Sequence, residues 1–289
     1  MRKEGKSEKS GSPGRMVGQY SKDFGIFQYL FSDFSDFLTS NMPDKLHKTK
    51  GIVLRTVKYG ETSVIVAIFT ELFGVQSYLV NGVRTSTKKG AGKAMLFQPS
   101  AILDLVVYHN ELKQLQRLKE FRWGHLYQHI LSDVKKNAVA LFMVELLTKC
   151  LKQPEEHTDL FHFAEDAFLH LDETNEAIAA NFPLYFALHL PVFFGFRIND
   201  NYAAKNNFLD LQEGNFVQQQ PTHPYFLEEK QAEVTSQILK TQRPEELEEI
   251  KLNHDFRRNL LYVLEKYYAL HIQDFGTLKT LPVLREILS

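Results

Sequence analysis

Residues 51–84 read GIVLRTVKYGETSVIVAIFTELFGVQSYLVNGVR and hold three short runs of β-branched and apolar residues. The runs are residues 52–57, 64–69 and 75–80. Each run is too short for a typical helix, and each is bounded by turn formers. Gly60 and Gly74 lie in the two breaks, where glycine can adopt the positive φ that closes a turn. The stretch therefore predicts three strands in a meander.

Two further strands are expected after a loop that is rich in glycine and lysine. The loop covers residues 84–93, and the strands cover residues 101–109 and 112–121. Five strands in this length fit a partly open Greek-key barrel of the OB type. An SH3-like barrel would satisfy the same count, so the pattern alone leaves both barrels open.

Several short motifs follow one another along the chain in a fixed order. They are GIVLRT at 51–56, YGETS at 59–63, IFT at 68–70, FG at 73–74, NGVR at 81–84, LPVFFGF at 190–196, FRRNLLY at 256–262 and LPVL at 281–284. In this order they resemble the bacterial recombination mediator family RecO. The resemblance covers residues 48–288 and is strongest in the first barrel.

The resemblance implies an α+β protein: an N-terminal five-stranded OB-type β-barrel, followed by a mostly α-helical domain with an irregular insert, which in this chain is cysteine-free. The expected boundaries are residues 42–123 for the barrel, 124–289 for the helical domain and 197–226 for the insert. The implied function is DNA repair and homologous recombination, without catalysis. Such a protein binds single- and double-stranded DNA, anneals complementary strands and assists recombinase loading onto DNA coated by single-strand-binding protein. RecR and single-strand-binding protein are the implied partners.

Composition sets limits on the class of protein. The chain has 289 residues, of which 44% are hydrophobic and 24% charged, as in ordinary globular proteins of two domains. No uninterrupted run of about 18 apolar residues occurs, so we expect no membrane span. Cys150 is the single cysteine, which excludes an internal disulfide and favours the cytoplasm, where a DNA repair protein would associate with the nucleoid.

The formal net charge of −1 hides an uneven distribution. Residues 42–123 hold 13 basic and 6 acidic residues, whereas residues 151–255 hold 7 basic and 19 acidic ones. A basic barrel is the expected footprint of a protein that binds a phosphate backbone. The alternative is that these charges only solvate a small barrel. The candidate DNA-binding residues are Lys48, Lys50, Arg55, Lys58, Tyr59, Arg84, Lys88, Lys89, Lys93 and Arg122.

Residues 1–41 differ from the rest of the chain. The first 15 are rich in Gly, Ser, Lys and Glu and are expected to be disordered. Aromatic residues then recur at helical spacing between Tyr20 and Phe37, which could form a short amphipathic helix that docks a partner. We interpret Met42 as the initiator and residues 1–41 as a disordered or spurious extension.

The spacing of apolar residues becomes helical after Trp123. Helices are expected at residues 134–150, 160–171, 182–196, 227–240 and 256–271. Gly195 is the expected C-cap of the third, and a small hairpin is expected within residues 208–217. Arg257 and Arg258 begin the last long helix away from its apolar face, where they could bind acidic residues of a partner or pair within the chain.

Motifs for nucleotide and metal chemistry are incomplete. The segment KKGAGK at 88–93 has one residue between its glycines and Ala94 after its last lysine, so it is no phosphate-binding loop, and a mobile basic loop is expected instead. His125 and His129 could share a helix face, but no further ligand completes a zinc site. Many RecO proteins hold zinc through four cysteines in the insert, and this chain has none there, so we predict no zinc.

No catalytic constellation is evident, and the aromatic residues are more informative. Bases stack on exposed aromatic rings in proteins that bind single strands. The barrel candidates are Tyr59, Tyr78, Phe97, Tyr108 and Trp123, of which we expect only Tyr59, in a turn, to be exposed. An alternative function is a non-catalytic adaptor whose basic barrel receives acidic protein tails.

Overall fold

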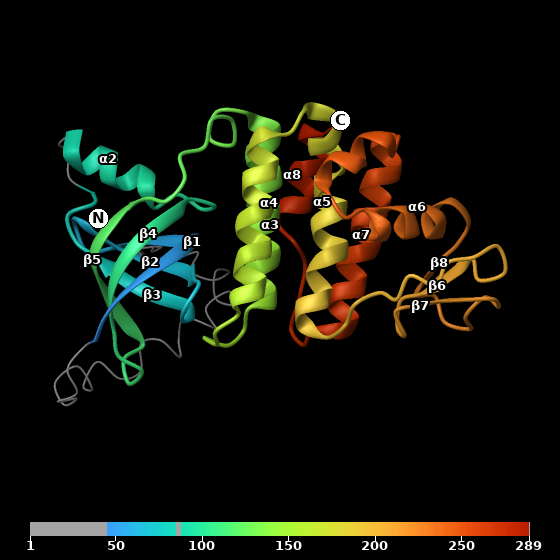
Figure 1. The fold of residues 1–289 in the computed structure, drawn as a ribbon, viewed down its shortest axis with the longest axis horizontal. Helices are drawn as coiled ribbons and strands as arrows, with labels where there is room; N and C mark the ends of the chain where they lie inside the picture. The colour runs from blue at the N-terminus through green and yellow to red at the C-terminus, as the bar shows by residue number, and fades with distance from the viewer. Residues whose placement is uncertain (1–44, 85–87, 289) are drawn as a thin grey trace, which may run out of the picture. The chain divides into compact units, whose positions relative to one another are not determined.

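The structure, a computed structural model, describes residues 45–84 and 88–288, with the backbone alone for residues 88–91. The expectation that residues 1–41 are disordered or spurious lies outside the described residues. Figure 1 shows the strands of the barrel in blue to green and the helices that follow in yellow-green to red.

Five strands form the N-terminal barrel. They are β1 (Lys45–Tyr59), β2 (Ser63–Thr70), β3 (Gly74–Val80), β4 (Ile102–His109) and β5 (Leu115–Trp123). They close in the order β1-β2-β3-β5-β4, and β3 and β5 form the one parallel pair among the paired strands of this barrel. The expected five-stranded OB-type barrel followed by a helical region is confirmed.

A bulge lies in β1, which pairs with two neighbouring strands. The strand pairs with β4 over its first half and with β2 over its second half, and its register shifts between Val53 and Arg55. Val53, Val66 and Tyr78 lie in a separate apolar core inside the barrel and are fully buried. A closed barrel of this size is filled by such side chains.

The expected loop at residues 84–93 is wrong in part, because α2 (Lys88–Leu96) is a helix. Gly90 and Gly92 weaken helix formation, but the segment ends at Phe97, which is 2% exposed in the barrel core. The hydroxyl of Thr56 donates to the carbonyl of Phe97 at 2.6 Å. Tertiary anchoring at this end therefore outweighs the poor local propensity.

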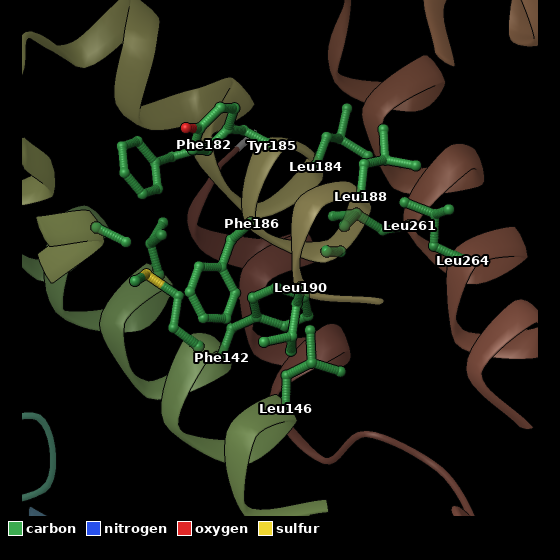
Figure 2. Packing of buried hydrophobic residues seen from close by; sticks show 14 of the residues in the cluster. Phe142, Leu146, Phe182, Leu184, Tyr185, Phe186, Leu188, Leu190, Leu261 and Leu264 are labelled. Carbon is green, nitrogen blue, oxygen red and sulfur yellow. The ribbon is translucent and has the colours of Figure 1, made fainter. Parts of the chain in front are cut away.

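The helical region contains α3 (Val134–Cys150), α4 (Thr158–Glu173), α5 (Glu176–His189), α6 (Glu229–Lys240), α7 (His254–His271) and α8 (Thr280–Ile287), with 3-10 helices η2 (Leu190–Phe194) and η3 (Pro244–Glu249). In Figure 2, Phe186 and Leu190 lie beside Phe142 and Leu146 of α3, and Leu184 and Leu188 turn towards α7. The middle of α5 is buried nearly all round, so it forms the centre of this core.

The third expected helix differs at both ends. It begins at Glu176 rather than residue 182, because Asn175 caps it by accepting from the N–H of Ile178 at 3.1 Å. It ends as η2, and Gly195 has φ +78°, which confirms the predicted C-cap. By length and apolarity alone Glu176–Phe194 could cross a membrane, but 67% of its 18-residue apolar window is buried inside the protein. It is a core helix.

The insert contains a small sheet of β6 (Phe208–Asp210), β7 (Asn215–Val217) and β8 (Phe226–Leu227). The β6–β7 pair confirms the predicted hairpin. Asn201 braces it twice, accepting from the N–H of Phe216 at 2.9 Å and donating to its carbonyl at 2.9 Å. His223 lies 3.2 Å from a carboxylate oxygen of Asp210. Packing and hydrogen bonds thus order this segment.

The barrel and the helical region share one hydrophobic cluster. Ile52, Leu54 and Phe69 of the barrel are buried together with residues of α3, α4 and α5. Phe69 meets Phe161 of α4 edge-on, with ring centroids 5.5 Å apart. The outer surface of the barrel is therefore covered where these residues lie.

Two polar and backbone contacts fix the same joint. Lys50 donates to Glu165 of α4 at 2.8 Å, and the side chain of Glu165 is only 11% exposed. Gly74 has φ +59° and lies so close to the backbone of Glu155 that a Cβ atom would overlap the Glu155 carbonyl. Only glycine fits this position without displacement of the chain.

Asp172 of α4 organises the connection from the barrel to α3. Its carboxylate accepts from the backbone N–H groups of Gln128, His129 and Ile130, each at 2.8 Å. Lys136 donates to the carbonyl of Asp172 at 2.7 Å. Burial alone would raise the pKa of Asp172, but the backbone N–H groups outweigh it and hold the pKa below its ordinary value.

Candidate nucleic-acid interface

The helical region leaves part of the outer barrel surface uncovered. Val57 of β1 lies opposite Ile65 of β2, and Ile65 lies opposite Leu79 of β3. Their neighbours Val66 and Tyr78 point into the barrel and are fully buried. Since alternate residues of a strand face opposite sides, Val57, Ile65 and Leu79 face outwards, and all three are half-buried. They form an apolar row across three strands.

Two arginines and a tyrosine border this row. β5 brings Arg117 opposite Leu79, and Arg55 lies in the adjacent row of β1, opposite Ala67. Tyr59 ends β1 and is half-buried. We call this set the outer barrel face: Arg55, Val57, Tyr59, Ile65, Leu79 and Arg117.

The outer barrel face combines the two properties that single-stranded nucleic acids require. Half-exposed apolar and aromatic side chains can stack on or pack against bases, at about 1 to 3 kcal/mol per aromatic–base stack. Arginine guanidinium groups bind phosphate oxygens and release counterions. In OB folds this same side of the sheet, with the adjoining turns, binds oligonucleotides.

Lys50, Arg122 and Arg84, which belong to the predicted DNA-binding set, make the following contacts within the protein. Lys50 is held by a buried acid of α4, and this hydrogen bond raises the pKa of Lys50 despite an opposing effect of burial. Arg122 donates through two nitrogens to Asp104, at 3.0 and 3.1 Å. Arg84 donates at 3.0 Å to a carbonyl of the β1–β2 turn. Lys50 therefore contributes to the joint between barrel and helices, whereas Arg122 and Arg84 each make a contact that would compete with phosphate binding.

The remaining predicted lysines lie apart from one another. Lys48 is exposed on the half of β1 that pairs with β4. Lys58 is exposed at the end of β1, on the side opposite to the outward-facing Tyr59. Lys93 is exposed on α2, while the side chains of Lys88 and Lys89 lie outside the described part of the chain. Of the predicted set, the structure brings Arg55 and Tyr59 together on one face.

Sequence reasoning missed Arg117 and the apolar row. Val57, Ile65 and Leu79 read as core residues, because a β-branched or aliphatic residue in a strand gives no sign of which face it occupies. Arg117 is one of the 13 basic residues of residues 42–123, and nothing in its sequence neighbourhood distinguishes it from the others. Buried and partly buried positions alternate from Ser63 to Ile68 of β2. Residues 64–69 are all apolar, so the sequence does not show this alternation.

The barrel aromatics divide differently from the prediction. Tyr78 and Phe97 are buried in the barrel core, as expected. Tyr59, Tyr108 and Trp123 are all half-buried, so Tyr59 is not singled out as the exposed ring. Trp123 packs on the barrel core, whereas Tyr108 lies opposite Arg117. Burial raises the pKa of the Tyr78 hydroxyl well above its ordinary value.

The predicted partner residues lie at the start of α7. Arg258 is 3.2 Å from Asp255, which is the pairing within the chain that the sequence left open. Arg257 donates to the carbonyl of Leu252, and burial lowers the pKa of its guanidinium. Arg257 also lines a groove formed where α3, α5 and α7 begin.

The paired histidines do not form a metal site. His125 and His129 lie in an irregular connection before α3, so the expected shared helix face is wrong. His129 instead contacts the carbonyl of Asp172 through Nδ1 at 2.8 Å. Within residues 45–84 and 88–288, no three His, Cys, Asp or Glu side chains come together as metal ligands.

Comparison with known proteins identifies the family. Residues 42–127 match the family model described as recombination protein O N terminal, and residues 131–281 match recombination protein O C terminal. The chain belongs to the RecO family. DNA repair protein RecO of Phocaeicola vulgatus is 32% identical over 244 residues, covering 84% of this chain and 100% of the relative. The RecO protein of Bacteroides fragilis is 34% identical over 244 residues, covering 84% and 99%. RecO proteins act in DNA repair and as mediators of recombination.

Proposed function

We propose that this RecO protein binds single-stranded DNA on the outer barrel face. The observation that carries the proposal is the half-exposed row of Val57, Ile65 and Leu79, bordered by Arg55 and Arg117 on the same outward side. A row of aliphatic side chains left uncovered by the helical region suits bases, and the flanking arginines suit phosphates. Double-stranded DNA would be bound more weakly here, because its bases are already stacked.

From this binding mode we infer the further steps of a recombination mediator. Two complementary strands, each held by its phosphates and bases, can be annealed, and recombinase can be loaded where single-strand-binding protein is displaced. The residues of the barrel carry the DNA, so residues 42–123 are the proposed DNA-binding domain and residues 124–289 the proposed protein-binding domain. The protein would act without catalysis, in the cytoplasm and on the nucleoid.

RecR and single-strand-binding protein are the proposed partners of the helical region. A groove of about 1190 Å³ opens where α3, α5 and α7 begin. Its lining contains the basic residues Lys135, Lys136, Lys251 and Arg257 and the acidic residues Asp133, Glu176 and Glu248, and Lys135 pairs with Glu176. The first turns of helices favour negative charge, which adds to the attraction for an acidic partner segment. We expect Arg257→Ala to weaken binding of an acidic partner more than Arg258→Ala, because Arg257 lines this groove and Arg258 does not.

Salt-dependent binding of a fluorescent single-stranded oligonucleotide tests the proposal. Replacement of Arg55 and Arg117 by alanine should weaken binding and reduce the slope of log affinity against log salt by about 0.7 for each phosphate that is no longer neutralised. Arg122→Ala is the matched control, since this arginine lies near the opposite end of β5 from Arg117, paired with Asp104. If the wild-type protein does not bind DNA even at low salt, the proposal is wrong. Binding of an acidic peptide under those conditions would support the adaptor function instead.

A further inference from the structure

The turn between β4 and β5 presents an isolated leucine to solvent. Leu112 is 70% exposed, which is the largest value among the exposed large apolar side chains of the described residues. Single exposed apolar residues are common on protein surfaces and need no explanation by themselves. The way in which this turn is built gives Leu112 a more specific meaning.

Two buried amide side chains brace the turn. Gln116, which is 2% exposed, donates through Nε2 to the carbonyls of Asn110 at 2.8 Å and Lys113 at 2.6 Å. Asn110, which is 7% exposed, accepts from the N–H of Leu112 at 3.0 Å through Oδ1. The N–H of Asn110 in turn donates to Oε1 of Gln116 at 3.1 Å. These bonds brace the backbone of the turn, and Leu112 lies exposed at its tip.

The surroundings of the tip favour a polyanion. Lys113 follows the leucine directly, and Arg117 lies at the base of the turn opposite Tyr108. Arg117 and Tyr108 continue the apolar row of the outer barrel face, because Arg117 also lies opposite Leu79. The turn thus rises from the edge of the surface to which we assign DNA binding. Glu111 is the one acidic residue within the turn.

We propose that Leu112 is a wedge that inserts between adjacent bases of DNA bound to the outer barrel face. This inference rests on the proposed DNA-binding function. Apolar side chains inserted at a base step unstack it, at a cost of a few kcal/mol that is smallest for single strands. A braced turn suits this role, since an ordered tip loses little conformational freedom when it binds. Unstacked bases are free to find complementary partners, which would assist strand annealing.

An oligonucleotide with one 2-aminopurine per strand reports the wedge, because the fluorescence of this base rises when it unstacks. The full-length protein should raise the signal at saturation. Leu112→Ala should bind with an unchanged salt slope but give about half of that increase or less. Leu112→Phe should retain the increase, because a ring can also separate bases. Leu126→Ala is the matched control, since Leu126 is 64% exposed but lies beyond the end of β5.

The outcomes separate the wedge from the function on which it rests. If the wild-type protein binds in a salt-dependent manner and Leu112→Ala gives the full increase, the wedge is overturned while DNA binding stands. If Leu112→Ala keeps the full increase but loses affinity for purified RecR, the turn docks a protein, which also overturns the wedge. Absence of wild-type DNA binding refutes both proposals.

Discussion

Replacement of Asp172 should destabilise the whole protein, because one carboxylate satisfies three backbone N–H groups of the connection between barrel and helices. Asp172 is 1% exposed, and its oxygens accept from Gln128, His129 and Ile130 at 2.8 Å. A hydrogen bond to a charged group contributes about 1.5 to 3 kcal/mol, and a buried donor left unpaired costs a similar amount. The three bonds are not additive, since they share one side chain.

Asp172→Asn keeps one oxygen as an acceptor and replaces the other with an NH2 group, which cannot accept from a backbone N–H. Oδ1 serves His129 and Ile130, whereas Oδ2 serves Gln128, so the asparagine should lose chiefly the latter bond. We expect a loss of about 2 kcal/mol for Asp172→Asn and about 3 to 5 kcal/mol for Asp172→Ala. For a chain of this size, the asparagine variant should melt about 4 to 8 °C lower.

Urea unfolding followed by circular dichroism measures these changes, and Asp166→Asn on the exposed face of α4 is the control, expected within about 0.5 kcal/mol of wild type. The pH dependence of the free energy of unfolding gives a second check. The pKa of Asp172 is lower in the folded protein than in the unfolded chain. The stability that the Asp172 carboxylate contributes is therefore complete above about pH 4 and is lost as pH falls through the folded pKa. The gap between wild type and Asp172→Asn should therefore narrow in acid. A variant as stable as wild type at pH 7 would refute the reasoning.

Three further substitutions test other parts of the structure. Gly74→Ala should lower the free energy of unfolding in urea by about 3 kcal/mol, since the backbone has φ +59° and a Cβ would overlap the Glu155 carbonyl. Gly60→Ala is the control: Gly60 has φ +57° but open space around it, so the loss should be only about 1 to 2 kcal/mol. Lys50→Ala should reduce stability by about 1 kcal/mol, discounted because the lysine side chain is 47% exposed, and should leave the salt slope of DNA binding unchanged; a lower slope would return Lys50 to the DNA interface. Tyr78→Phe should be neutral or stabilising by up to about 1 kcal/mol, because the Tyr78 hydroxyl is buried without a hydrogen-bond partner among the described residues, and a clear loss of stability in thermal melts would show that it has one.

The meander and the long helices could be predicted because local signals and tertiary structure agree. The three runs of residues 51–84 are separated by Gly60 and Gly74, and both glycines have positive φ in the structure. Helix α2 could not be predicted, since Gly90 and Gly92 argue against a helix and the anchoring of its end by Phe97 is a tertiary contact. The start of α5 depends on the cap that Asn175 provides, which apolar periodicity does not reveal.

The residues of the outer barrel face are set by a bulge in β1 that the sequence does not reveal. Up to Val53, alternate residues of β1 point into the barrel, and the bulge before Arg55 reverses this phase. Arg55, Val57 and Tyr59 face outwards only because of that extra residue. A count of basic residues therefore does not indicate which face of the barrel each residue occupies, and the predicted set included Lys50 and Arg122, which the fold pairs with acids.

The shared hydrophobic cluster has a consequence for dissection of the protein. Ile52, Leu54 and Phe69 are barrel residues, yet they are buried by the helices rather than by the barrel's own core. A shortened chain that ends after β5 would leave this patch in water, where an apolar surface beside strands promotes aggregation. We expect the barrel and the helices to melt in a single cooperative transition, so the stability of the proposed DNA-binding surface depends on helices that do not form part of it.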